Sequence, residues 1–122
     1  MISRSLLRVA LSLAFALPVA AAYAHAQLES ATPPVGGTVA AASEIRLHFS
    51  EGVEPRFSGV TLTAASGGAA ALGAAKIQPG DPTVLIVPVA KPLAPGVYTV
   101  HWHAVSVDTH HTQGSFQFTV KP

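Results

Sequence analysis

Residues 97–107, VYTVHWHAVSV, form the longest stretch typical of a β-strand in this chain of 122 residues. Successive side chains of a strand point to opposite faces of the sheet, so residues 98, 100, 102 and 104 share one face. These four are Tyr, Val, Trp and Ala, whereas the other face carries His101 and His103. We therefore expect the apolar face to line a core, with Trp102 near its centre.

Four further stretches rich in β-branched and aromatic residues are separated by Gly and Pro. They are residues 44–50 (EIRLHFS), 57–65 (FSGVTLTAA), 83–89 (TVLIVPV) and 115–120 (SFQFTV). The spacing predicts an all-β fold of about seven strands, a Greek-key β-sandwich or barrel. Pro88 places its stretch at a sheet edge or a bulge, because proline donates no ladder hydrogen bond. Residues 64–75, rich in Ala and Gly, predict a loose hairpin that adds little to the core.

The first 24 residues have the three parts of a secretory signal peptide. Arg4 and Arg8 give a positive start, residues 6–22 are almost entirely apolar, and residues 22–24 (AYA) fit the small-x-small cleavage rule. A transmembrane anchor is the weaker alternative, because Pro18 interrupts the run and the second arginine shortens its uncharged part below the usual ~20 residues. We expect cleavage after residue 24, a periplasmic location and no membrane insertion afterwards.

Residues 25–122 would then form one domain of 98 residues without Cys or Met. This length suits a single hydrophobic core, and the absence of cysteine excludes disulfides and thiolate chemistry. Loss of Arg4 and Arg8 leaves five Lys and Arg against six Asp and Glu, a net charge of about −1 with neutral histidines. Such a balance does not predict a nucleic-acid partner. All six histidines lie in this part of the chain.

The position of cleavage decides whether His25 becomes the first residue, since residues 24–26 (AHA) also fit the small-x-small rule and a cut there would discard it. An N-terminal histidine chelates one ion through its α-amine and its ring Nδ1, and the amine loses its proton readily near neutral pH because its usual pKa is about 7.7–8.0. Asp108 and His110 lie two apart in the loop DTHHTQG and add an oxygen and a nitrogen. Three nitrogens and one oxygen suit one Cu(II) ion.

The remaining histidines are weaker candidates for metal binding. His101 and His103 lie about 7 Å apart on one strand face. They would form either a weak second metal site or a pH-sensitive patch, and we favour plain exposed residues because no third ligand is evident beside them. His111 is a minor candidate, because an adjacent pair rarely aims both rings at one ion. His48 is expected to be an ordinary surface residue.

The chain resembles the CopC family of periplasmic copper-binding proteins over residues 25–37 (HAQLESATPPVGG), 45–62 (IRLHFSEGVEPRFSGVTL) and 96–120 (GVYTVHWHAVSVDTHHTQGSFQFTV). The resemblance implies a cupredoxin-like or immunoglobulin-like β-barrel. It also implies a Cu(II) site formed by the mature N-terminal histidine and the Asp-x-His of the last loop, here His25, Asp108 and His110. Glu51 matches a position near that site, as an outer-shell or weak ligand or else as a solvated turn carboxylate.

The methionine content of this chain differs from that of some members of the CopC family. Family members that also bind Cu(I) carry a methionine-rich loop at the far end of the domain. The only methionine here is Met1, so a Cu(I) site is expected to be missing.

These observations predict a periplasmic Cu(II)-binding protein that is no enzyme. It would sequester copper or hand it to an inner-membrane copper transporter or another copper-resistance protein. One alternative is a small copper redox enzyme with a histidine brace, like the polysaccharide monooxygenases, although those proteins are larger and the Asp108 ligand argues against it. The other is an immunoglobulin-like interaction module without metal.

Overall fold

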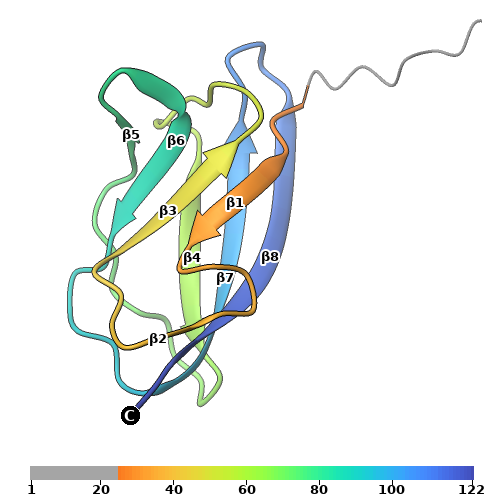
Figure 1. The fold of residues 1–122 in the computed structure, drawn as a ribbon. Helices are drawn as coiled ribbons and strands as arrows, with labels where there is room; N and C mark the ends of the chain where they lie inside the picture. The colour runs from red at the N-terminus through yellow and green to blue at the C-terminus, as the bar shows by residue number, and fades with distance from the viewer. Residues whose placement is uncertain (1–24) are drawn as a thin grey trace, which may run out of the picture.

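The computed structural model describes residues 25–122, so the predicted signal peptide lies outside the described residues. Two four-stranded sheets pack face to face (Figure 1). One sheet has the strand order β1-β3-β6-β5 and the other β2-β8-β7-β4. The strands are β1 (Leu28–Thr32), β2 (Thr38–Val39), β3 (Glu44–Phe49), β4 (Gly59–Ala64), β5 (Lys76–Gln78), β6 (Asp81–Pro88), β7 (Gly96–Val105) and β8 (His111–Val120). The predicted all-β sandwich is confirmed. Among residues 25–122, no helix is long and apolar enough to cross a membrane.

Strand β7 has the predicted two faces. Its residues 98, 100, 102 and 104 are buried in the core, whereas His101 and His103 are exposed. The Trp102 ring packs edge-on against Phe49 of the opposite sheet, with ring centroids 5.3 Å apart. Aromatic pairs in this arrangement add about 0.5–1.5 kcal/mol beyond the area that they bury. Trp102 is therefore a core residue, as predicted, and its ring also connects the two sheets.

Two expectations about the strands need correction. The described residues form eight strands rather than about seven, and the two-residue strand β2 pairs in parallel with the end of β8. The stretch that contains Pro88 is not an edge strand, because β6 lies between β3 and β5. Pro88 is the last residue of β6 and lies beyond the part of the strand that β5 pairs with. Its missing N–H therefore leaves the inner ladder intact.

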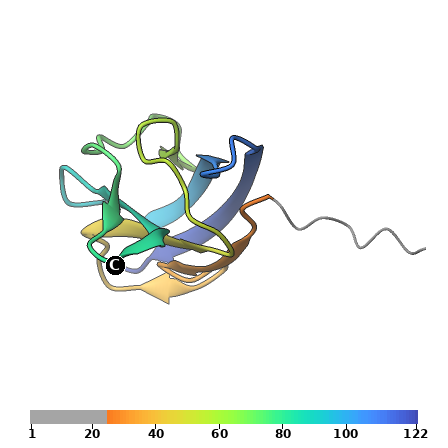
Figure 2. The ribbon, with the colours of Figure 1, turned by 90° about the horizontal axis from the view of Figure 1, so that it is seen from above.

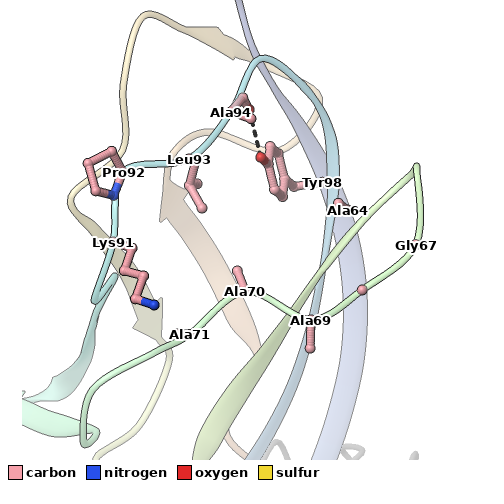
Figure 3. A pocket seen from close by; sticks show the side chains of 11 residues that line it. Ala64, Gly67, Ala69, Ala70, Ala71, Lys91, Pro92, Leu93, Ala94 and Tyr98 are labelled. Carbon is pink, nitrogen blue, oxygen red and sulfur yellow. Dashed lines mark hydrogen bonds between the residues drawn. The ribbon is translucent and has the colours of Figure 1, made fainter.

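The Ala- and Gly-rich residues 64–75 lie at the end of the sandwich where β7 begins. They make isolated bridges from Ala69 to Thr63 and from Leu72 to Val89, and alanines of this segment pack with Leu72 against the core. None of residues 64–75 is itself buried, so the segment adds only partly buried contacts at the margin of the core, in line with the expectation. Part of the segment lines a shallow hollow of about 360 Å³, over which the Tyr98 hydroxyl donates to Ala94 O at 2.6 Å (Figure 3).

The candidate ligands lie at the opposite end of the sandwich, where β3 and β7 end and β6 and β8 begin (Figures 1 and 2). Backbone hydrogen bonds join the loops there. Val53 N donates to Pro82 O at 2.9 Å, Glu54 N to Val105 O at 2.8 Å, and Val107 N to Gly52 O at 3.1 Å. This end of the molecule is thus built from segments far apart in the sequence.

Candidate metal centre

The segment around His25 is held by both sheets. Ala26 is fully buried, and the Thr112 hydroxyl of β8 donates to its carbonyl at 2.9 Å. Gln27 N donates to Ser50 Oγ at 2.8 Å, while Ser50 N donates to Gln27 O at 2.8 Å. Hydrogen bonds thus fix the two residues that follow His25 between the end of β3 and the start of β8.

The loop that carries Asp108 and His110 is organised by Ser106. This serine is fully buried, its N–H donates to His110 O at 2.9 Å, and Thr109 N donates to its carbonyl at 2.8 Å. Thr109 has φ 72°, the left-handed conformation that β-branched residues rarely adopt. The turn therefore reverses the chain within a few residues and presents Asp108 and His110 together.

The structure brings His25, Asp108 and His110 next to one another. The rings of His25 and His110 meet edge to face, with centroids 4.5 Å apart and an interplanar angle of 89°. His110 Nδ1 lies 3.1 Å from Asp108 Oδ2. His25 Nδ1 is buried and has no hydrogen-bond partner among residues 25–122, a situation that costs about 1–3 kcal/mol for a typical polar group. An unpaired imidazole nitrogen beside a second imidazole and a carboxylate fits a metal ion that prefers nitrogen and oxygen donors.

The Asp108 carboxylate is stabilised in its charged form. The Ser106 hydroxyl donates to Oδ1, and this hydrogen bond is the largest cause that lowers the pKa of Asp108, followed by the interaction with His110. Desolvation acts in the opposite direction and is outweighed. Asp108 is therefore an anion at neutral pH, the form that a cation requires.

The side chains alone do not complete a metal site. Within residues 25–122, no group of three or more His, Cys, Asp or Glu side chains is arranged to hold an ion. In the uncleaved chain the backbone nitrogen of His25 is also an amide, since Ala24 precedes it. The donor that a cut after Ala24 would add is an amine of the main chain, which no set of side chains includes.

The minor candidates lie in different positions. Glu51 is half-buried between Ser50, which bonds to Gln27, and Gly52, which bonds to Val107. It thus adjoins both segments that carry the candidate ligands. His101 and His103 lie exposed on the outer face of β7, and His111 is exposed opposite Val105.

His103 and His111 line a hollow of about 490 Å³ on the outer face, together with Phe57, Val105 and Thr109. The ring of His103 lies over Gly59, because a Cβ placed on that glycine would be 3.2 Å from His103 Cε1. Thr112, the neighbour of His111, points the other way and bonds to Ala26. The outer histidines are therefore not among the groups that meet His25.

Three hydroxyl residues, Ser50, Ser106 and Thr112, support the site and were not singled out from the sequence. Ser106 lies two residues before Asp108, and both are residue types whose side chains commonly form local hydrogen bonds in turns. That local pattern could have identified it. Ser50 and Thr112 act across the sandwich, over separations that only the fold reveals.

The sequence matches a known domain family and known proteins. The CopC domain model matches residues 28–121. The chain is 44% identical over 117 residues to protein YobA of Escherichia coli K12, covering 94% of each chain. It is 45% identical over 107 residues to copper resistance protein C of Pseudomonas syringae pv. tomato, covering 84% of this chain and 85% of that protein.

A solved structure of the same class superposes on the sandwich. The crystal structure of PcoC, a methionine-rich copper resistance protein from Escherichia coli, matches with a TM-score of 0.72 and 37% identity. The match covers 80% of this chain and 99% of that structure. The domain model, the sequence relatives and the solved structure all point to the same family, and the chain belongs to the CopC family of copper resistance proteins.

Proposed function

We propose that the mature protein begins at His25 and binds one Cu(II) ion as its cargo. The α-amine and Nδ1 of His25, a ring nitrogen of His110 and a carboxylate oxygen of Asp108 would hold the ion. The observation that carries the proposal is the buried His25 Nδ1. It has no hydrogen-bond partner within the described part of the chain and lies in the ring that meets His110.

The donor chemistry favours the oxidised ion. Imidazole, amine and carboxylate donors suit Cu(II), which also leads the divalent series in affinity, whereas thioether and thiolate ligands favour Cu(I). PcoC is described as methionine rich, but this chain has only Met1 and no cysteine. We therefore propose a Cu(II)-only protein without the methionine site.

Glu51 completes the proposal as a residue beside the ion rather than one of its main ligands. It lies between the two backbone anchors Ser50 and Gly52, next to both ligand segments. A carboxylate there favours a cation electrostatically and can accept a hydrogen bond from a ligand.

The role that fits this site is copper sequestration or delivery in the periplasm. Cleavage after Ala24 would create the amine only after export, so the precursor would lack the chelate. Protons compete with the ion for the amine and both imidazoles, so affinity falls as the pH drops. A copper transporter of the inner membrane or another copper-resistance protein would receive the ion. We propose no catalytic role, because four protein donors leave little room for a substrate, in contrast to open catalytic metal sites.

Intact mass followed by Cu(II) titration tests this function. The secreted protein should have the mass of residues 25–122 and bind one equivalent with an EPR spectrum of nitrogen-rich tetragonal Cu(II). His25→Ala and His110→Ala should weaken binding by orders of magnitude. One extra residue before His25 should do nearly the same, because it moves the amine. A mature chain that begins at Gln27, or an extended chain that binds as tightly as the native one, would contradict the chelate.

A further inference from the structure

We infer that Ser50 and Thr112 are positioning residues, whose hydroxyl groups set where the N-terminal chelate lies relative to the Asp108–His110 loop. The inference rests on the proposed Cu(II) site. It concerns two side chains, one directly after β3 and one on β8 of the other sheet, neither of which is a ligand in that proposal.

The contacts converge on the peptide unit that joins Ala26 to Gln27. Thr112 Oγ1 donates to Ala26 O at 2.9 Å, and Ser50 Oγ accepts from Gln27 N at 2.8 Å. The same Ser50 oxygen lies 3.5 Å from His25 O, at the limit of a hydrogen bond. This one peptide unit is therefore held at both its C=O and its N–H by hydroxyl side chains rather than by regular sheet pairing, which begins at Leu28.

The position of these ties matters because a chain terminus is otherwise the least ordered part of a domain. In the mature protein only His25 extends beyond the tie at Ala26. Its amine and ring then start from a fixed point, and little conformational entropy remains to be lost when both bind an ion. Preorganisation of this kind raises affinity without adding a ligand.

The hydroxyl groups can be separated from the packing around them. Ser50 N still donates to Gln27 O when the side chain is shortened, so the backbone contact between the segments persists. Ala26 is fully buried in the core and keeps its apolar contacts when Thr112 loses its hydroxyl. Removal of either hydroxyl thus loosens the N-terminal residue more than it disturbs the fold.

The test compares mature Ser50→Ala, Thr112→Val and the double variant with the native protein. A single hydrogen bond contributes a net amount that corresponds to about two- to tenfold in affinity. Each single variant should lose Cu(II) affinity by about that factor, and the double variant should lose more. The EPR hyperfine lines should broaden or split into two species, because the amine and ring then occupy more than one arrangement.

Conservative and remote variants serve as controls. Thr112→Ser and Ser50→Thr keep a hydroxyl and should restore both the affinity and the native spectrum. Thr99→Val removes a hydroxyl on the outer face of β7, where its partner is Gln117, and should change neither. Thermal unfolding without copper should place all variants close to the native protein, which separates positioning from global stability.

Two outcomes would overturn the inference in distinguishable ways. If the native protein binds Cu(II) with dependence on His25 but the double variant has the same affinity and spectrum, the positioning role is wrong and the proposed site stands. If the native protein has no His25-dependent Cu(II) binding, the proposed function fails and the inference fails with it.

Discussion

Gly114 is the residue on which the packing of Trp102 depends. The two residues lie opposite each other on β8 and β7, and the indole ring occupies the space where a side chain at position 114 would be. A Cβ on Gly114 would lie 2.7 Å from Trp102 Cζ2 and 2.8 Å from Cε2, closer than real atoms approach. Glycine is thus required here by a close approach rather than by backbone conformation.

Gly114→Ala should therefore destabilise the fold. Forcing a methyl group into a filled core costs about 1–3 kcal/mol, and the only tryptophan of the chain reports on it. Urea unfolding followed by Trp102 fluorescence measures the loss. Gly59→Ala is the matched control on the same sheet, because its methyl group would meet the exposed ring of His103, which can turn away. Equal unfolding free energies for the two variants would contradict this account.

The Ser106 hydroxyl determines the charge state of Asp108 at low pH. A pKa that is lowered in the folded protein means that this carboxylate adds stability at pH values above its ordinary pKa of 3.8. That contribution is lost as the pH falls through the lower, folded-state pKa. The carboxylate is exposed, so the effect is local to the loop and small for the whole domain.

Ser106→Ala should raise the pKa of Asp108 toward its ordinary value in the copper-free protein. Carboxyl-carbon NMR during an acid titration measures it directly. Asp81 is the internal control, because its own lowered pKa comes mainly from the Thr83 hydroxyl at the start of β6 and should stay unchanged. A low Asp108 pKa that survives the substitution would mean that His110, rather than the serine, holds the charge.

Successive side chains of β7 and β8 point to opposite faces of their sheet, and this alternation decides which histidines can reach the candidate site. Thr112 points inward to Ala26, so its neighbour His111 points outward, where it shares a hollow with His103. His110 comes before β8 begins and escapes the alternation, which allows its ring to meet His25. Adjacent residues of identical type thus face different surroundings.

His103→Gln and His111→Gln should leave the first equivalent of Cu(II) and its EPR spectrum unchanged. His110→Gln should abolish that spectrum, because it removes a proposed ligand while preserving size and polarity. All three substitutions lie at the same end of the β7–β8 hairpin. They differ only in which face of the sheet the side chain occupies, so the comparison isolates the effect of that face. A changed spectrum in His111→Gln would place its ring in the copper site and would contradict the alternation.

The long elements could be predicted from the sequence because they alternate or bury continuous runs. Strands β3 and β7 alternate regularly between buried and more exposed residues, and the two faces of β7 are as predicted. The position of β6 in its sheet is harder to predict. Residues 84 to 87 are all buried, and a continuous apolar run does not show which strands lie on either side of it. Pro88 suggested an edge, but β5 pairs with β6 only before the proline. Two- and three-residue strands such as β2 and β5 carry too little pattern to be recognised.

The residues of the candidate site also fall into two groups, those that the sequence alone identifies and those that only the fold reveals. His25, Asp108 and His110 were identified from ligand chemistry and spacing, and the fold brings them together. Ser50 and Thr112 could not be identified, because each acts on residues more than twenty positions away in the sequence. Hydroxyl residues are common, and only the meeting of two sheets gives these two their partners.

At the scale of the whole molecule, charged residues are distributed unevenly between the two ends of the sandwich. Acidic residues outnumber basic ones at the end that carries the candidate site: Glu51 and Glu54 lie between β3 and β4 together with Arg56, Asp81 lies at the start of β6, and Asp108 lies after β7. Lys91 and Lys121 follow β6 and β8 at the opposite end. Such a field raises the local concentration of cations and speeds their association, and salt weakens it over about 10 Å at 0.1 M ionic strength.

Neutralising one carboxylate near the site should therefore slow copper capture without removing a ligand. Glu54 is suited to this test, because its backbone N–H bonds to Val105 O beside the loop and its side chain is not among the proposed donors. Glu54→Gln should lower the association rate of aqueous Cu(II) roughly two- to threefold at low ionic strength. Stopped-flow quenching of Trp102 fluorescence at pH 6 measures the rate.

Glu44→Gln is the matched control for this experiment. Glu44 begins β3 at the far end of the sandwich, where it pairs with Arg46 at 3.0 Å, and its loss changes the net charge by the same amount. If net charge alone governed capture, both variants would slow equally. Because the field depends on distance from the loop, we expect only Glu54→Gln to slow capture, and 0.5 M salt should bring its rate and the native rate together. A difference that persists in high salt would assign Glu54 a direct contact with the ion instead of an effect through the field.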